Sequence, residues 1–550
     1  MKTACFILSL LLVNMCIAQV NIIPKPEQVT MPASAGTFTI TSSTVIVANK
    51  VTKNSADFLN DYLQEVYGFR LKISDSKPAA NTINLLVVTP THTTEGAYDL
   101  DVTSNGVNVR GQNAEGTFYG MQSLIQLLPA AKSNSLAIPF VTIHDQPRFQ
   151  YRGLMLDCGR HFFPISFVKK YIDFIALHKM NYFHWHLTED QGWRIEIKKY
   201  PMLTQKGAFR NGTITGYYPG TGNDHDISGG FYTQDDIKDV VAYAAKRYIT
   251  IVPEIEMPGH ASAAIAAYPQ LSCFPDEPTV KYFPKKGVWA GDSTGKQVQQ
   301  TWGIFDDVYV PSENTFKFIE NVLDEVIPLF PGKYIHVGGD ECPKANWKRS
   351  AFCQQLMKEK GLKDENELQS YFVQRVEKYI NSKGKTMIGW DEILEGGLAP
   401  NAVVMSWRGE EGGIAAAKQK HHVIMTPEAY VYLNLAQGNP DDSLTYDEYL
   451  PLQKVYNYDP VPGALQNSDT SYILGAQANV WTEYMSNSEM VEYMIFPRLS
   501  AMSEVLWSNK AARNYDDFSK RLTTQFKRYD LWKVHYSKQF FKDMGSTGAK

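Results

Sequence analysis

Residues 334–341 read YIHVGGDE, and this stretch decides how the rest of the chain is read. The run at 334–337 is apolar and β-branched, which is typical of a buried strand. Two glycines then lead directly to the neighbouring acids Asp340 and Glu341. Neighbouring carboxylates repel each other. The pair therefore belongs either to a solvent-exposed turn or to a site whose chemistry uses both acids.

The same alternation of a short apolar run and an amphipathic segment recurs on both sides of this stretch. After residue 150, strands are predicted at 153–157, 182–187, 249–255, 334–337, 386–390, 403–407, 423–426 and 473–480. Helices are predicted at 165–179, 233–248, 314–329, 367–383, 413–418 and 489–506. Strands that are apolar throughout are buried on both faces, as in a parallel sheet.

Eight such units favour a (β/α)8 TIM barrel with insertions, spanning residues 147–510. A doubly wound open sheet is the alternative. It is disfavoured because no glycine-rich phosphate turn follows the first strand. The tail at 511–550 contains an amphipathic run at 518–532, which is predicted to be a helix packing on the barrel.

Residues 19–146 form a separate unit in which strands and helices follow in a mixed order. Strands are predicted at 38–48, 82–88 and 106–110, and helices at 55–67 and 114–128. The polar, proline-containing segment at 144–148 marks the boundary. The fold class is therefore α/β, with a TIM barrel preceded by a smaller α/β domain.

The first 18 residues have the features of a signal peptide. Lys2 is followed by an apolar run at 6–13, and cleavage is expected after Ala18. We expect an exported protein, periplasmic or extracellular, with no transmembrane segment. Cys16 leaves lipoprotein anchoring as a minor alternative.

Cysteine content and net charge limit the remaining possibilities. Cleavage would leave four cysteines whose pairing the sequence leaves open, namely Cys158, Cys273, Cys342 and Cys353. The net charge of −4 over 550 residues shows no excess of basic residues that would indicate binding to a nucleic acid or an anionic membrane. The oligomeric state also stays open.

Acidic, basic and aromatic side chains gather at the predicted strand ends, where active sites of TIM barrels form. They include Asp157, Arg160, Glu189, His260, Asp340, Glu341, Trp390, Trp407, Tyr432, Asn434, Trp481 and Glu483. A single acid in such a position is usually a helix cap or a solvated turn. Acids, an arginine, a histidine and three tryptophans at the ends of separate strands indicate a sugar-binding pocket instead.

Asp340 and Glu341 are too close in sequence for the usual two-carboxylate glycosidase. That mechanism places its carboxylates on opposite sides of the scissile bond, roughly 5–10 Å apart. Neighbouring Cα atoms lie only about 3.8 Å apart. A different division of roles fits better: one acid protonates the leaving oxygen, and the other orients a substrate group that attacks the anomeric carbon. The acetamido group of an N-acetylhexosamine is such a nucleophile, closing to an oxazoline or oxazolinium ion.

At this point the sequence resembles glycoside hydrolase family 20, the β-N-acetylhexosaminidases. The resemblance is carried by HVGGDE at 336–341 and, in order, by RGLMLDCGRH at 152–161, HWHLTEDQGWR at 184–194, PEIEMPGH at 253–260, GWDE at 389–392, SW at 406–407 and WTE at 481–483. It covers nearly the whole mature chain, including the α/β domain that precedes the barrel. It implies exo-acting, retaining hydrolysis of terminal β-linked N-acetylhexosamine from a carbohydrate substrate, with no cofactor.

The resemblance also implies a role for each matching residue. Glu341 matches the general acid and base, and Asp340 the carboxylate that orients the acetamide nitrogen. Tyr432 matches the residue that hydrogen-bonds the acetamide oxygen, while Trp390, Trp407 and Trp481 match the walls of the pocket. Arg160 and Glu483 match readers of the sugar hydroxyls, and His260 and Glu189 match partners that tune the acid. We expect this relay, and the charge of Asp340, to hold Glu341 protonated near working pH.

Three positions depart from the family pattern. Glu189 and Glu256 stand where many members have Asp, which lengthens the side chain and keeps its charge. Asn434 stands where many members have an Asp that faces the 4- or 6-hydroxyl. Because an amide both donates and accepts, we expect altered tolerance at C4 or C6, for instance toward N-acetylgalactosamine.

Three rival interpretations are disfavoured. His184 and His186 at a strand end could bind a metal in a barrel hydrolase, but no further histidines stand at strand ends 5 and 6, and a packed structural role is favoured. A non-catalytic N-acetylhexosamine-binding protein would not need every catalytic acid. A chitinase-like enzyme of the other substrate-assisted family would carry a DxxDxDxE run on strand 4, and no such run exists.

Overall fold

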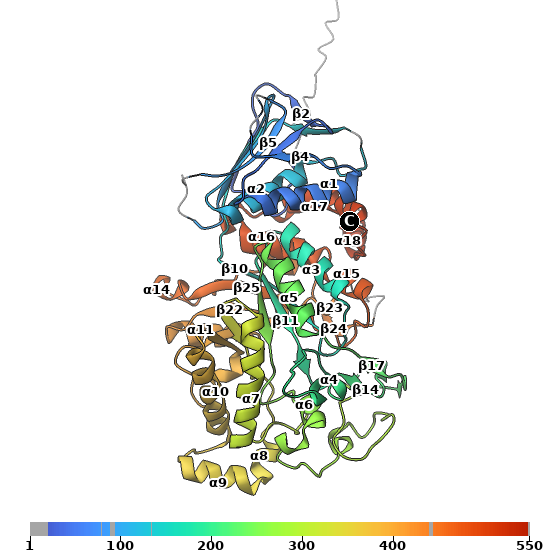
Figure 1. The fold of residues 1–550 in the computed structure, drawn as a ribbon, viewed down its shortest axis with the longest axis vertical. Helices are drawn as coiled ribbons and strands as arrows, with labels where there is room; N and C mark the ends of the chain where they lie inside the picture. Colours follow the sequence, from blue (N-terminus) through green and yellow to red (C-terminus); the bar gives the residue numbers. More distant parts are fainter. Residues whose placement is uncertain are drawn as a thin grey trace, which may run out of the picture.

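The computed structural model describes residues 20–547, apart from 77, 79, 89–93, 134 and 439–443 (Figure 1). The expected signal peptide and Cys16 therefore lie outside the described residues. A mixed sheet with two helices lies at one end of the molecule and a barrel at the other (Figure 1). Among the described residues, no helix combines the length and hydropathy needed to cross a bilayer.

The predicted TIM barrel is confirmed. Its eight parallel strands close in chain order: β10 (Tyr151–Asp157), β11 (Tyr182–His186), β18 (Thr250–Glu254), β19 (Tyr334–His336), β20 (Thr386–Trp390), β21 (Val403–Ser406), β22 (Val423–Met425) and β25 (Ile473–Ala478). Parallel pairing of β10 with both β11 and β25 closes the ring. Nearly every strand residue is buried, which explains why these runs are apolar on both faces.

Helices follow most strands, as predicted: α3 (Ile165–Leu177), α5 (Gln234–Ala245), α7 (Glu313–Val326), α10 (Glu365–Ser382) and α11 (Glu411–Lys418). The helix predicted at 489–506 is instead two helices, α15 (Ser488–Ile495) and α16 (Arg498–Trp507). They are separated at Pro497, because proline has no N–H to continue the ladder and disfavours helical backbone in the residue before it.

The first domain is a seven-stranded mixed sheet in the order β1-β9-β6-β7-β5-β3-β4. Its strands are β1 (Gln28–Thr30), β3 (Val45–Val47), β4 (Lys72–Ser74), β5 (Thr82–Val87), β6 (Tyr98–Thr103), β7 (Gly106–Gly111) and β9 (Val141–Asp145). Helices α1 (Lys53–Tyr67) and α2 (Ala114–Leu127) pack against each other, and α2 also packs on the sheet.

The strand predicted at 38–48 is in fact two strands in different sheets. β2 (Thr37–Ile40) pairs with β8 (Leu136–Pro139), whereas β3 belongs to the large sheet. A turn closed by the Thr44 amide donating to the Thr41 carbonyl separates them, at 2.9 Å.

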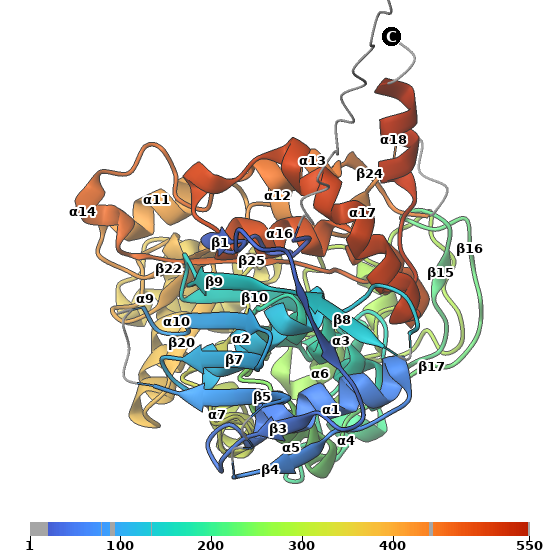
Figure 2. The same cartoon turned by 90° about the horizontal axis from the view of Figure 1, so that it is seen from above.

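The first domain covers the amino end of the barrel and leaves the carboxyl ends of the strands free. Arg152, at the start of β10, donates to the Tyr119 hydroxyl of α2 at 2.6 Å. The predicted C-terminal helix is α17 (Tyr515–Leu531), which lies between the two domains in Figure 1 and beside α16 in the view from above (Figure 2). Arg521 of α17 forms an ion pair with Glu504 of α16 at 2.7 Å and also donates to the Ile22 carbonyl. The tail therefore packs on the barrel and on the first domain.

A fully buried ion pair fastens the two domains together. The Lys179 ammonium lies 3.0 Å from Asp145 of β9 and 2.8 Å from the Tyr98 hydroxyl. It also lies over the Trp507 ring, 4.6 Å from the centroid. The barrel and the first domain therefore share one desolvated charge pair.

We predict that Lys179→Met lowers the free energy of unfolding by about 3–5 kcal/mol, because it leaves Asp145 buried without its cation. Denaturant unfolding monitored by circular dichroism measures the change. The matched control is Lys53→Met, which breaks the exposed pair Lys53–Asp57 and should cost less than about 0.5 kcal/mol. Equal effects of the two substitutions would contradict the proposed domain coupling.

Candidate active site

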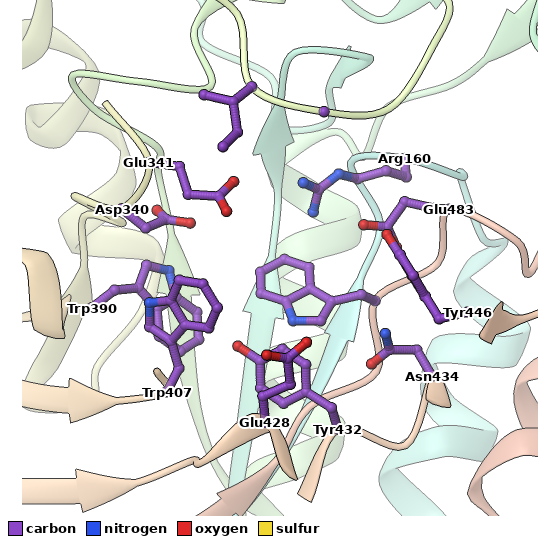
Figure 3. A pocket seen from close by; sticks show the side chains of 13 residues that line it. Arg160, Asp340, Glu341, Trp390, Trp407, Glu428, Tyr432, Asn434, Tyr446 and Glu483 are labelled. Carbon is purple, nitrogen blue, oxygen red and sulfur yellow. The ribbon is translucent and has the colours of Figure 1, made fainter. Parts of the chain in front are cut away.

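A cavity of about 320 Å³ opens at the carboxyl ends of the barrel strands. It is lined by Arg160, Gly303, Ile304, Asp340, Glu341, Trp390, Trp407, Glu428, Tyr432, Asn434, Tyr446, Trp481 and Glu483 (Figure 3). All nine residues that the sequence analysis assigned to catalysis or substrate binding are in this set. The two predicted partners of the acid, Glu189 and His260, are buried behind it.

Asp340 and Glu341 lie on the same wall of the cavity, opposite Arg160 and Glu483 (Figure 3). The turn after β19 brings them there with left-handed backbone at Gly338 (φ 67°), Gly339 (φ 93°) and Glu341 (φ 43°). Left-handed backbone is uncommon for a residue with a side chain such as Glu341. The glycine at 338 is also required by space, since a Cβ there would collide with the carboxylate of Glu256.

His260 joins the two acids to a second layer of carboxylates. Its Nε2 lies 3.4 Å from Glu341 and 3.7 Å from Asp340. Its Nδ1 lies 2.8 Å from Glu189 and 3.1 Å from Asp190. Burial alone would lower the pKa of His260, but the charge of Glu189 and the surrounding hydrogen bonds raise it well above its usual value. The imidazole is therefore charged at neutral pH.

The proton distribution in the empty site is the reverse of the one expected from the sequence. Burial raises the pKa of Glu341, but the hydrogen bond and charge of His260, helped by Arg160, outweigh burial and bring this pKa below its usual value. Burial and the charge of Glu341 raise the pKa of Asp340 to about 7, against the opposing charge of His260. The expectation that Asp340 and the His260 relay keep Glu341 protonated is wrong for the empty site, because the nearby cation favours the carboxylate form of Glu341.

Several buried polar atoms at the cavity have no hydrogen-bond partner among the described residues. They are Nε and Nη1 of Arg160, Oδ1 of Asp340, Oδ1 of Asn434 and Oε2 of Glu483. Buried polar groups are normally paired. These atoms therefore offer donors and acceptors of both kinds to a polar ligand such as a sugar.

Indole rings form the apolar walls, and hydrogen bonds fix their orientation. Trp390 Nε1 donates to Glu254 at 2.9 Å, and Trp407 Nε1 donates to Glu392 at 2.9 Å. The rings of Trp407 and Tyr432 are nearly parallel, 6.3 Å apart at an angle of 17°. A cavity with flat apolar walls and convergent polar atoms is suited to a sugar ring.

The two histidines considered as metal ligands are held by a carboxylate. Glu254 lies 3.0 Å from His184 Nε2 and 2.8 Å from His336 Nδ1, and it also contacts His186. Burial would raise the pKa of Glu254, but the three imidazoles lower it well below the usual value. The same spacing would also suit the ligands of a metal ion, so the packed structural role of His184 and His186 stays a prediction.

Models of known families match both parts of the chain. The glycosyl hydrolase family 20 catalytic domain matches residues 149–510, and domain 2 of the same family matches residues 19–146.

The chain belongs to glycoside hydrolase family 20.

Named relatives of this family 20 chain include enzymes and a solved structure. A beta-hexosaminidase of Porphyromonas gingivalis is 46% identical over 94% of this chain and 64% of the relative, and one of Vibrio furnissii is 34% identical over 88% and 76%. The chain thus spans slightly less than two thirds of the first relative's length. The solved exo β-N-acetylglucosaminidase of Vibrio harveyi, in complex with N-acetylglucosamine, is 34% identical, covers 94% of this chain and 78% of its own, and has a TM-score of 0.82.

Some residues of this family 20 site were not assigned from the sequence. Glu428 and Tyr446 line the cavity but follow β22 in long connections, where no periodic pattern points to a site. Asp190 contacts His260 beside Glu189, and the paired acids of the EDQ run at 189–191 were the available signal. Glu254 stands at the end of β18, and only the structure shows that three histidines converge on it.

Proposed function

We propose that this chain hydrolyses terminal, non-reducing β-linked N-acetylhexosamine with retention of configuration, through an oxazoline or oxazolinium intermediate. The carrying observation is that Asp340 and Glu341 share one wall of the cavity (Figure 3). Two carboxylates that flank a glycosidic bond need to face each other across it. A nucleophile supplied by the substrate removes that requirement.

In the proposed mechanism the substrate's acetamido group lies among the indole walls. Asp340 accepts a hydrogen bond from the acetamide N–H, and Tyr432 donates one to its carbonyl oxygen, which then attacks the anomeric carbon. Glu341 donates its proton to the leaving oxygen and later takes a proton from the water that opens the ring. The Asp340 carboxylate stabilises the positive charge that develops on the amide.

Substrate binding would move the proton from Asp340 to Glu341. In the empty site the proton shared by the two acids is on Asp340, because its pKa is about 7 while that of Glu341 is below its usual value. An acetamide N–H donating to Asp340 favours its charged form, and that charge in turn raises the proton affinity of Glu341. With substrate bound, Asp340 is therefore the charged carboxylate that orients the acetamido group, and Glu341 is the protonated general acid.

The position of the hydroxyl-reading groups supports removal of a single terminal sugar. Arg160, Glu483 and Asn434 lie together on the wall facing the acids (Figure 3). Each has polar atoms without a hydrogen-bond partner among the described residues. These groups would bind the outer hydroxyls of one ring and leave the next sugar to pass the mouth of the cavity. Ile304, which is 54% exposed, lines that cavity from a long loop and would contact the leaving part of the glycan.

We also propose that the protein is exported. This proposal rests on the charge, the apolar run and the small residues of segment 1–18 alone. It fits a substrate class that is found on glycans outside the cytoplasm, and it places the cysteines in a compartment where disulfides form.

We predict that Glu341→Gln and Asp340→Asn impair hydrolysis in different ways. With an unactivated disaccharide, each should lower kcat/KM by about 10²–10⁴-fold. With a 4-nitrophenyl N-acetylglucosaminide, which needs little protonation to depart, Glu341→Gln should lose much less than Asp340→Asn. Parallel assays on the two substrates measure the difference.

The matching glucoside, which lacks the acetamido group, should not be cleaved by the wild type. Cleavage of that glucoside at a comparable rate would exclude substrate assistance. Absence of wild-type turnover on every N-acetylhexosaminide, with binding retained, would favour a sugar-binding protein instead.

We predict that wild-type kcat/KM falls as the pH rises above about 7, where the acid pair loses its single proton. A pair with no proton has no acid to donate, so activity declines tenfold per pH unit. In Asp340→Asn this limb should move to lower pH. Removing a neighbouring negative charge lowers the pKa of Glu341, and the His260 cation that also lowers it is kept. An alkaline limb that stays in place in Asp340→Asn would assign it to another group.

We predict that Asn434→Asp changes the choice between epimeric substrates. Asn434 Oδ1 is an unpaired acceptor at the cavity, and the amide nitrogen adds a donor that a carboxylate lacks. The ratio of kcat/KM for aryl N-acetylglucosaminide to that for aryl N-acetylgalactosaminide should rise by about threefold or more in the variant. An unchanged ratio would remove Asn434 from specificity at C4.

A further inference from the structure

Two cysteines that belong to different segments lie next to each other beside the active site. The Sγ atoms of Cys273 and Cys353 are 3.8 Å apart, although 80 positions separate them in sequence. Both thiols are free in the structure. A disulfide has its sulfur atoms about 2.05 Å apart, so a combined movement of roughly 1.8 Å would join them. We propose that Cys273 and Cys353 form a disulfide that fastens the loop at the mouth of the active site to the helix behind the catalytic turn.

Contacts on both sides of the pair already hold the two segments in place. Arg349, just before α9 (Ala351–Lys360), forms an ion pair with Glu277 at 2.5 Å. The same guanidinium lies over the Phe274 ring, 4.2 Å from its centroid. Residues next to each cysteine are therefore bound to residues next to the other, so the sulfur atoms stay close without a covalent bond.

Hydrogen bonds and ion pairs also fix the residues around each cysteine. The Cys353 amide donates to Ser350, the N-cap of α9, at 3.3 Å. On the other segment, Ser272 donates to Asp307 at 2.5 Å, and Asp307 forms a buried ion pair with Lys296 at 2.7 Å. The disulfide would thus link two segments whose positions are already fixed by other contacts, which limits the strain of forming it.

Both linked segments connect to the active site. One is the loop that runs from Cys273 to Ile304, and Ile304 lines the cavity. The other is α9, which follows the turn that carries Asp340 and Glu341. Cys353 packs in one apolar cluster with Cys342, the residue after Glu341, and with Trp347. Closing this link would restrict movement of the loop relative to the catalytic turn.

Access and proximity define an order of steps. Cys273 is partly exposed, whereas Cys353 is buried. The Cys273 thiolate attacks one sulfur of a small disulfide oxidant, which forms a mixed disulfide and releases one thiol. The Cys353 thiolate then attacks Sγ of Cys273 and releases the second thiol. Two protein thiols are thereby oxidised and one oxidant disulfide is reduced to two thiols.

The test uses the full mature chain purified in its reduced form and incubated with oxidised glutathione. Free thiols are counted under denaturing conditions, and cross-linked peptides are identified by mass spectrometry after alkylation. We expect two free thiols, Cys158 and Cys342, and a single Cys273–Cys353 cross-link. Four free thiols, a stable glutathione adduct at Cys273 or a cross-link through Cys342 would each overturn the proposal.

Thermal unfolding provides an independent readout with a matched control. Oxidation should raise Tm by about 5 °C, because the bond closes a long loop of the unfolded chain. The double variant Cys273→Ser/Cys353→Ser should have the Tm of the reduced protein and show no response to the oxidant. Hydrolysis of a small aryl substrate should be unchanged, since neither cysteine lines the cavity. A shift of equal size in the double variant would also overturn the proposal.

Discussion

The contact between the His260 imidazolium and its carboxylates is the interaction on which the active site depends. One buried cation faces Glu189 and Asp190 through Nδ1, and Asp340 and Glu341 through Nε2. Without it, four carboxyl groups would share a desolvated space, and most of them would have to bind protons. The cation decides which of them stays charged. Of the two catalytic acids, it favours the carboxylate form of Glu341 more strongly, since Glu341 is the nearer.

This arrangement means that the protein alone does not store a loaded general acid. The acid pair carries one proton, and its place depends on what lies against Asp340. In the proposed mechanism, a ligand that donates to Asp340 releases the proton for Glu341, whereas a sugar without an acetamide does not. Under that proposal, selectivity for the acetamido group and activation of the acid are the same event. That coupling depends on the two acids being neighbours, since the charge of one carboxylate shifts the pKa of the other less when the two are farther apart.

Much of this organisation could be predicted from the sequence, and the failures have physical causes. Apolar runs located all eight barrel strands. The nine catalytic and substrate-binding residues predicted at or after the ends of these strands all line the cavity. Patterns of residue type did not show that Pro497 divides a helix or that a turn at Thr41–Thr44 sends two strands to different sheets. They also gave the wrong direction for the pKa of Glu341. That direction depends on whether the nearest charge is Asp340 or His260, and such distances are properties of the folded turn.

The histidine layer below the cavity explains how a wall made of indole rings keeps its shape. Glu254 accepts a hydrogen bond from Trp390 Nε1 and lies 3.0 Å from His184 and 2.8 Å from His336. Packing alone would leave an indole ring free to slide in its plane, because dispersion contacts have little directional preference. A hydrogen bond to a charged acceptor fixes both the position and the rotation of the ring. The charge on Glu254 is in turn kept by its three imidazole neighbours. The proposed mechanism, in which the pocket holds an acetamido group within reach of the substrate's anomeric carbon, needs walls fixed in this way. The buried layer supplies that rigidity, while the wall residues themselves remain apolar toward the sugar.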